Sequence, residues 1–413
     1  MSLRPILGRL TFALFAAGLV VLAGTGPVQA GGSAVARALA LPKASLLVEE
    51  GGKAVVAHQA DRPMMPASTM KLLTALAAIQ RWGLDHHFET RLLRDGEGRL
   101  WVQGAGDPYL VSEELDLMAR AVRAVGVTSV TGVGADDTLF APTLDIPGRS
   151  ASSNPYDAPV TALAANFNTV NLRVKGGAVA SNESQTPLTP LAQRLGRGLG
   201  NGTQRVNLKD SGLGARYFAE VFSAKLEAAG VRVTGEPVVG RVPFGAKALL
   251  THRNSRSLRA VLAPMLEYSN NFVANGLFVA LADRGDGSTI TIARAQKSMA
   301  AWIDKTFRWR DYRVEDGAGL SRGNRLSARQ LVDVLDAFAP YRSLMPRQGD
   351  QILAKTGTLT GVSAYAGYVN RDGAWIPFSL LINQAVDAGL RKQVATELVR
   401  AQNLRALCPG ASC

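Results

Sequence analysis

The sequence predicts an α/β protein of the α+β kind, with one five-stranded antiparallel sheet flanked by helices and a mainly β inserted domain. Residues 45–59 alternate apolar and polar side chains around two adjacent glycines, which is the pattern of a β-hairpin. Three further strand-like runs, at 351–357, 363–369 and 375–383, lie near the other end of the chain. Because neither group has another sheet to join, we expect both chain ends to build a single sheet.

Residues 1–30 have the pattern of a cleavable signal peptide. Arg4 and Arg9 precede an apolar stretch that ends near Leu22, and small residues follow up to Ala30. We expect cleavage after Ala30 and export to the periplasm or another extracytoplasmic compartment. An uncleaved anchor is the alternative, but the apolar stretch is short for a membrane span of about 20 residues.

Residues 31–87 are expected to form the first part of the main domain, with a helix that begins near Pro66. Leucines and an isoleucine at helical spacing supply a buried stripe, and the alanines between them favour the helix. Ser68 and Lys71 are three positions apart near its start, so the hydroxyl and the amine lie on one face and can touch. The plain alternative is that both are first-turn polar residues of an amphipathic helix.

Residues 88–250 are expected to form the inserted domain, because short β-like runs separated by Gly- and Pro-rich turns replace the helical pattern there. Residues 251–413 then return to the main domain. Helices are expected at 113–125, 215–229, 291–305, 327–338 and 388–404.

The composition is that of a globular protein. Of 413 residues, 47% are hydrophobic and 19% charged, which excludes intrinsic disorder and suffices for two or three domains. The net charge is +13, and loss of Arg4 and Arg9 with the signal leaves +11. This charge favours anionic cell-envelope polymers as partners. Nucleic acid is disfavoured because no basic run is interleaved with aromatic residues, and the oligomeric state stays open.

The two cysteines, Cys408 and Cys413, lie five positions apart at the end of the chain. In an oxidising compartment they can form a small terminal disulfide. Neither is spaced like a catalytic thiol or a metal cluster, so we interpret them as structural or incidental.

Two more short motifs accompany the serine and lysine of the first helix. An S-x-N triplet at 269–271 begins a helical run, and a K-T-G triplet at 355–357 ends a strand-like run. A second S-x-N match at 152–154 precedes a proline in a loop, which is a poor place for a rigid catalytic group. We therefore choose the triplet at 269–271.

These residue types predict serine acyl-enzyme chemistry. Ser68 is the candidate nucleophile, because a helix N-terminus favours developing negative charge. Lys71 must be neutral to accept the serine proton, and burial together with the nearby cation of Lys355 lowers its pKa. Ser269 can pass a proton between the two lysines and the leaving amine, while the amide of Asn271 holds Lys71.

The K-T-G strand is the candidate substrate-binding edge. Gly357 has no side chain and lets a peptide lie against the strand as an added β-strand. Lys355, with Thr356 or Thr358, can bind a terminal carboxylate. The backbone N–H groups of Ser68 and Thr358 are the candidate oxyanion hole. Such a cycle requires no metal and no cofactor.

The three motifs in this order resemble the penicillin-recognising serine acyl transferases. The gap of about 200 residues between Ser68 and Ser269 is too long for a β-lactamase. It resembles the class C low-molecular-mass penicillin-binding proteins, the D-alanyl-D-alanine carboxypeptidase/endopeptidase family. The segments GAGDPYL (104–110) and DGAGLSRGNRLSARQL (316–331) are similar to segments of that family, with Ala318 in place of its usual serine.

The resemblance spans nearly the whole mature chain and implies the penicillin-recognising serine transferase fold. It implies cleavage of D-alanyl-D-alanine, and of cross-links between D-alanine and a diamino acid, in peptidoglycan peptides. It also implies covalent binding of β-lactam antibiotics. The balance of carboxypeptidase and endopeptidase cleavage and the identity of the diamino acid stay open. Asp107 and Asp157 are only candidates for a specificity carboxylate.

A non-catalytic peptidoglycan-binding protein that retains the fold is the alternative function. Such a protein is expected to lose Ser68, Lys71 or Lys355, and all three are present.

Two other motif matches fail. The G-x-S-x-G run at 319–323 is no hydrolase nucleophile elbow, because the last histidine of the chain, His252, precedes it. His86 and His87 lack the H-E-x-x-H spacing of a zinc site, and we interpret them as a solvated helix end.

Overall fold

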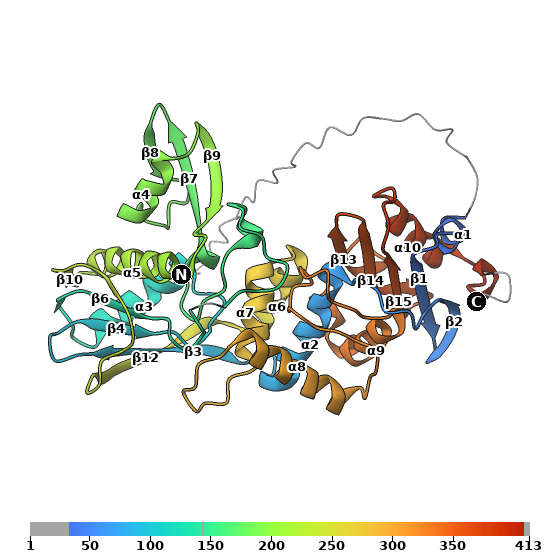
Figure 1. Cartoon of the computed structure of the whole chain (residues 1–413), viewed down its shortest axis with the longest axis horizontal. Helices are drawn as coiled ribbons and strands as arrows, with labels where there is room; N and C mark the ends of the chain where they lie inside the picture. The colour runs from blue at the N-terminus through green and yellow to red at the C-terminus, as the bar shows by residue number, and fades with distance from the viewer. Residues whose placement is uncertain (1–32, 143, 409–413) are drawn as a thin grey trace, which may run out of the picture. The chain divides into compact units, whose positions relative to one another are not determined.

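The computed structural model describes residues 33–142 and 144–408 (Figure 1). From Ser33 onward the described chain forms one compact unit. The expected signal peptide and the expected bond between Cys408 and Cys413 fall outside the described residues. No helix within the described ranges is long and apolar enough to cross a membrane.

Both ends of the described chain contribute to one five-stranded sheet, as the sequence predicts. Its strand order is β13-β14-β15-β1-β2, and every neighbouring pair is antiparallel. The strands are β1 (Ala44–Glu50), β2 (Lys53–His58), β13 (Ile352–Leu359), β14 (Val362–Arg371) and β15 (Ala374–Ile382). β1, which lies between β15 and β2, is buried from Ala44 to Val48, because helices cover both of its faces.

Helices cover the two faces of this sheet (Figure 1). α1 (Ala34–Leu39) and α10 (Leu390–Arg400) pack on one face around an apolar core that includes Leu46 and Phe378. α9 (Ala328–Phe338) lies on the other face, with α2 (Met70–Trp82) behind it. The last helix is shorter than the expected 388–404.

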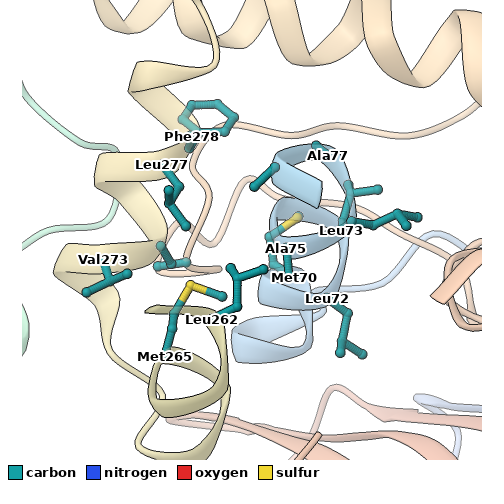
Figure 2. Close-up of a cluster of buried hydrophobic side chains, with 14 of the residues drawn as sticks. Met70, Leu72, Leu73, Ala75, Ala77, Leu262, Met265, Val273, Leu277 and Phe278 are labelled. Atoms are coloured by element: carbon teal, nitrogen blue, oxygen red, sulfur yellow. The ribbon is translucent and has the colours of Figure 1, made fainter. Parts of the chain in front are cut away.

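The core beside the sheet is helical. α2 is buried from Met70 to Ile79, as expected for a helix that is apolar on nearly every side. Figure 2 shows that Met70 lies on the side of α2 that faces two later helices, near Leu262 and Met265, while Leu72 and Leu73 point to the other side. The helices that surround α2 with α9 are α6 (Leu258–Glu267), α7 (Asn271–Ala280) and α8 (Ile292–Thr306).

A second five-stranded sheet is built between α2 and α6 of the chain. Its order is β11-β6-β4-β3-β12, and α3 (Ser112–Ala124) and α5 (Ser211–Ala228) pack on it around a separate apolar core. Its strands are β3 (His87–Arg94), β4 (Leu100–Gln103), β6 (Val133–Asp136), β11 (Val238–Val239) and β12 (Lys247–Ser257). β12 passes through residue 250, where the sequence analysis ends the insertion, and the domain boundaries stay predictions.

Smaller elements complete this part of the chain. β5 (Ser129–Val130) pairs in parallel with β10 (Arg232–Val233). A three-stranded sheet with the order β8-β7-β9 is packed by one helix. Its elements are β7 (Thr169–Lys175), β8 (Ala178–Ser181), β9 (Gly202–Asn207) and α4 (Pro190–Arg197).

Candidate active site

Ser68 lies in a 3₁₀ turn, Ala67–Thr69, that leads directly into α2. The helix proper therefore begins at Met70, slightly later than expected. The Thr69 hydroxyl donates to the carbonyl of Pro66 at 2.7 Å and closes the turn. Ala67 has a φ of 46°, in the left-handed region that is unfavourable for residues other than glycine. The strained backbone at Ala67 thus immediately precedes Ser68, which is half-buried at the helix start.

Lys71 is fully buried and binds three groups at once. Its Nζ donates to Asn271 Oδ1 at 2.8 Å and to the carbonyl of Ala318 at 2.9 Å, and it lies 3.1 Å from Ser68 Oγ, so a neutral amine keeps its lone pair for the serine hydroxyl. Burial, followed by the positive charge of Lys355, lowers the pKa of Lys71 well below its ordinary value, although Asp316 opposes the shift. These conditions favour a neutral amine beside the serine hydroxyl.

The S-x-N triplet lies between α6 and α7. Asn271 is the first residue of α7, and its Nδ2 donates to the carbonyl of Tyr156 at 3.2 Å. Ser269 precedes the helix in a turn with a φ of 55°. Within the described ranges, the Ser269 hydroxyl makes no hydrogen bond to Lys71 or to Lys355. The structure therefore brings together Ser68, Lys71 and Asn271, but does not connect Ser269 to either lysine.

The K-T-G triplet lies on β13, the edge strand of the main sheet. The segment 346–348 covers the first half of this edge, where Ala354 N–H donates to Pro346 at 3.0 Å and Gln348 N–H to Ile352 at 2.8 Å. Because N–H groups alternate between the two sides of a strand, those of Thr356 and Thr358 point to the same side as that of Ala354.

From Lys355 to Leu359 no other strand of the described chain pairs with this side of β13. A peptide can therefore add to the sheet there.

Gly357 lies against the nucleophile turn. A Cβ atom on this residue would lie 2.9 Å from Ser68 N and 2.8 Å from the carbonyl oxygen of Pro66. Only glycine allows this approach without displacement of the turn. The turn that carries Ser68 therefore packs directly against β13, one residue before Thr358, the second expected oxyanion donor.

Lys355 and Arg391 supply positive charge beside this edge. Lys355 is buried and donates to the carbonyl of Thr356 at 3.0 Å. Arg391 Nη1 donates to the carbonyl of Gly357 at 3.0 Å and to Thr358 Oγ1 at 2.9 Å. Burial, followed by the charge of Arg391, lowers the pKa of Lys355 to about 8. The two cations and the two threonine hydroxyls can bind a carboxylate.

Arg391 is not among the site residues that the sequence predicts. It lies in the first turn of α10, where an arginine in a polar helix carries no signal of a binding role. Only the packing of α10 against the main sheet places it beside the K-T-G triplet.

The loop that follows α8 belongs to the segment 316–331, which the sequence marks only as similar to the family, and its contacts with the site were not predicted. The buried Asp316 accepts hydrogen bonds from the backbone N–H groups of Ala318 and Leu320, each at 3.0 Å, and fixes the carbonyl that binds Lys71. Gly319 has a φ of 80°, and a Cβ on it would lie 1.9 Å from the carbonyl oxygen of Ala67. The loop therefore supports both the base and the nucleophile turn.

The two candidate specificity carboxylates are buried and bonded locally. Asp157 accepts from the backbone N–H of Ser150 at 3.1 Å and from the hydroxyls of Ser150 and Ser152. Asp107 accepts from Asn254 Nδ2 at 2.8 Å, and its burial raises its pKa to about 6. Neither carboxylate bonds to a residue of the three motifs within the described ranges.

Among the described residues, no group of three or more His, Cys, Asp or Glu side chains is placed to hold a metal ion.

The fold and the cluster of Ser68, Lys71 and Asn271 define an enzyme of the penicillin-recognising serine class. The model of the D-Ala-D-Ala carboxypeptidase 3 (S13) family matches residues 43–193, 207–347 and 342–403, and the chain belongs to this family. The expected resemblance and the expected class, a serine-type D-Ala-D-Ala carboxypeptidase, are thereby confirmed.

Known relatives cover most of the chain. It is 29% identical to a D-alanyl-D-alanine carboxypeptidase from an Actinomadura species, over 80% of this chain and 76% of the relative. It is 23% identical to the D-alanyl-D-alanine carboxypeptidase DacB of Haemophilus influenzae, over 78% of this chain and 80% of the relative.

Solved structures share the fold. The crystal structure of penicillin binding protein 4 from Haemophilus influenzae matches with a TM-score of 0.72 and 20% identity, over 88% of this chain and 98% of the other. A predatory peptidoglycan endopeptidase from Bdellovibrio bacteriovorus matches with a TM-score of 0.54 and 15% identity, over 88% of this chain and 93% of the other.

Proposed function

We propose that Ser68 is the nucleophile with which this carboxypeptidase cleaves D-alanyl-D-alanine ends of peptidoglycan stem peptides. The observation that supports this most directly is the position of the buried Lys71 amine, within hydrogen-bond distance of both Ser68 and Asn271. A nucleophile beside a base that a third group orients is the usual arrangement for covalent catalysis. The same serine is acylated by β-lactam antibiotics, whose strained amide resembles the peptide bond.

The reaction begins when Ser68 Oγ attacks the carbonyl carbon and its proton passes to the neutral amine of Lys71. The backbone N–H groups of Ser68 and Thr358 hold the oxyanion of the tetrahedral intermediate. When the intermediate collapses, the carbon–nitrogen bond breaks and the leaving amine takes the proton that Lys71 received from Ser68. A relay of this proton through Ser269 stays a prediction. Water then hydrolyses the serine ester and restores the free hydroxyl.

Substrate binding is assigned to the free part of the β13 edge. The peptide lies along Thr356, Gly357 and Thr358 as an added strand, while the carboxylate of the leaving D-alanine contacts Lys355. Arg391, which touches Thr358 Oγ1, adds a second positive charge to this carboxylate subsite. Both cations hold their charge more easily once a carboxylate is bound.

The test is labelling of the mature protein with a fluorescent penicillin, followed by peptide mapping. One adduct on Ser68, absent from Ser68→Ala, is expected, and an adduct on Ser321 or Ser152 would overturn the assignment. A protein that takes up no label and releases no D-alanine from a pentapeptide would instead be the non-catalytic peptidoglycan-binding alternative. Mass analysis of digested peptidoglycan identifies the products.

Export and envelope attachment are part of the same proposal. The first thirty residues direct the chain to the periplasm or another extracytoplasmic compartment, where its substrate lies. The net charge of +11 that remains without Arg4 and Arg9 attracts it to anionic envelope polymers. Amino-terminal sequencing of the secreted protein is expected to start at Gly31, and its retention on an anionic polymer is expected to fall as salt is added.

A further inference from the structure

A pocket of about 410 Å³ lies at the end of the free β13 edge. Its walls are formed by Glu267, Arg342, Met345, Arg347, Leu353 and Trp375. Leu353 and Lys355 are two positions apart on β13, so their side chains point to the same face of the sheet. Glu267 acts electrostatically on Lys355 and raises its pKa, against the larger effect of burial. The pocket therefore lies next to the candidate carboxylate subsite, on the same face of the sheet.

The direction of the bound peptide determines what can enter this pocket. In the proposed binding mode, the scissile carbonyl lies beside Ser68 and Thr358, and the carboxylate of the leaving group lies beside Lys355, nearer the start of β13. A leaving group longer than D-alanine must continue in the same direction. It cannot continue along the strand edge, because the segment 346–348 already pairs with Ile352 and Ala354 there. The pocket is the space that remains open to it.

We propose that this pocket binds the second stem peptide of a cross-linked substrate, which is the leaving group when a cross-link is cleaved. In carboxypeptidase cleavage the leaving group is D-alanine, which extends no further than the carboxylate subsite and therefore does not contact the pocket. The inference rests on the proposed function of Ser68 and names the residues that favour endopeptidase cleavage. It assigns Arg342 and Arg347 to the carboxylates of that second peptide.

Two arginines against the one carboxylate of Glu267 leave the pocket net positive, which fits an acidic peptide. Arg342 and Arg347 are exposed, and within the described ranges neither forms an ion pair with a carboxylate. Among the described residues, each guanidinium donates only to one nearby carbonyl, that of Ala339 at 3.1 Å for Arg342 and that of Asp350 at 3.5 Å for Arg347. Both are thus available for carboxylates, which arginine binds through two parallel hydrogen bonds. Trp375 is half-buried and offers an apolar wall to the peptide backbone.

The test compares two substrates on the mature enzyme. One is a monomeric pentapeptide, which only carboxypeptidase cleavage shortens. The other is a cross-linked dimer whose free stem ends in a single D-alanine, so that only the cross-link is cleaved. In the variant Arg342→Gln with Arg347→Gln, kcat/KM for the dimer is expected to fall about tenfold or more, as for loss of charged hydrogen bonds. The value for the pentapeptide is expected to stay within about twofold of wild type, because free D-alanine never reaches the pocket.

A matched control removes two other exposed arginines, by Arg120→Gln on α3 and Arg173→Gln on β7. It lowers the net charge equally and is expected to leave the ratio of the two kcat/KM values unchanged. The charge reversal Arg347→Glu is expected to lower dimer cleavage further than Arg347→Gln, and more strongly at low salt.

The outcomes separate the two proposals. If the double variant cleaves dimer and pentapeptide in the wild-type ratio while Ser68 is still acylated by penicillin, the pocket has no such role. An equal fall for both substrates also overturns it. If the wild-type enzyme is not acylated on Ser68 at all, the proposed function fails first and the pocket assignment fails with it.

Discussion

The side-chain nitrogen of Lys71 lies 3.1 Å from the hydroxyl oxygen of Ser68, although the lysine is fully buried. Burial makes the charged form costly, so the nitrogen is held in the form that accepts a proton. The same burial would be a pure loss of stability for a residue without a chemical task. Four predictions test this arrangement and its surroundings.

Replacement of Lys71 by alanine is expected to slow acylation of Ser68 by penicillin about 10²–10⁴-fold, because the general base is lost. The rate of appearance of the fluorescent adduct measures the effect. Lys297→Ala, which removes an exposed lysine from α8, is the control and should acylate at the wild-type rate. A folded Lys71→Ala protein with an unchanged acylation rate would mean that Ser68 and Lys71 are only polar residues on one face of the helix.

The pH dependence of kcat/KM is expected to be bell-shaped. On the acid side the rate falls as Lys71 gains a proton and ceases to be a base. On the alkaline side it falls near pH 8, because Lys355, with a pKa of about 8, loses the charge that binds the carboxylate. Lys355→Arg keeps its charge at high pH but not the compact ammonium. It should therefore lower turnover and move the alkaline limb upward, and an unmoved limb in a pH-rate series would contradict this assignment.

Alanine variants of Gly319 and Gly361 distinguish the cost of a strained backbone conformation from the cost of a steric clash. Both have positive φ, but a Cβ on Gly319 would lie 1.9 Å from the carbonyl oxygen of Ala67, whereas Gly361 has nothing within 4 Å. Gly361→Ala is expected to cost about 1–2 kcal/mol from its backbone conformation alone.

Gly319→Ala should cost about 1–3 kcal/mol more, because the overcrowded turn must shift. It should also slow acylation, since Ala67 precedes the nucleophile. Urea unfolding and acylation rates measure both effects, and equal behaviour of the two variants would refute the contact argument.

Arg391→Gln is expected to weaken capture of the substrate carboxylate and to reduce kcat/KM about tenfold, as for loss of one charged hydrogen bond. Because Arg391 lowers the pKa of Lys355, its removal should also shift the alkaline limb upward. Lys392→Gln alters the next residue, which is exposed, and serves as the control. Steady-state kinetics across pH 6 to 10 measure both kcat/KM and the position of the alkaline limb. A lower kcat/KM with an unchanged alkaline limb would limit Arg391 to a structural role.

Local sequence determined the elements and the first contact of the site. The alternation around Gly51 and Gly52, whose φ values of 59° and 73° only glycine adopts easily, predicts the hairpin of β1 and β2. Helical geometry alone predicts that Ser68 and Lys71 touch, because residues three apart share a face. Order and spacing of the three motifs predicted the family, which the comparisons confirm.

Only the tertiary structure decided which distant groups complete the site. Ala318 supplies its carbonyl to Lys71, Arg391 approaches Thr358, and the segment 346–348 closes half of the β13 edge, yet no periodic pattern marks any of them. The proton relay expected of Ser269 also depends on tertiary packing. Within the described ranges, the Ser269 hydroxyl makes no hydrogen bond to Lys71 or Lys355. These contacts join segments far apart in sequence, and the burial of shared apolar cores sets how such segments lie together. Short-range sequence patterns predict which faces of helices and strands are buried, whereas tertiary packing decides which of these faces contact each other.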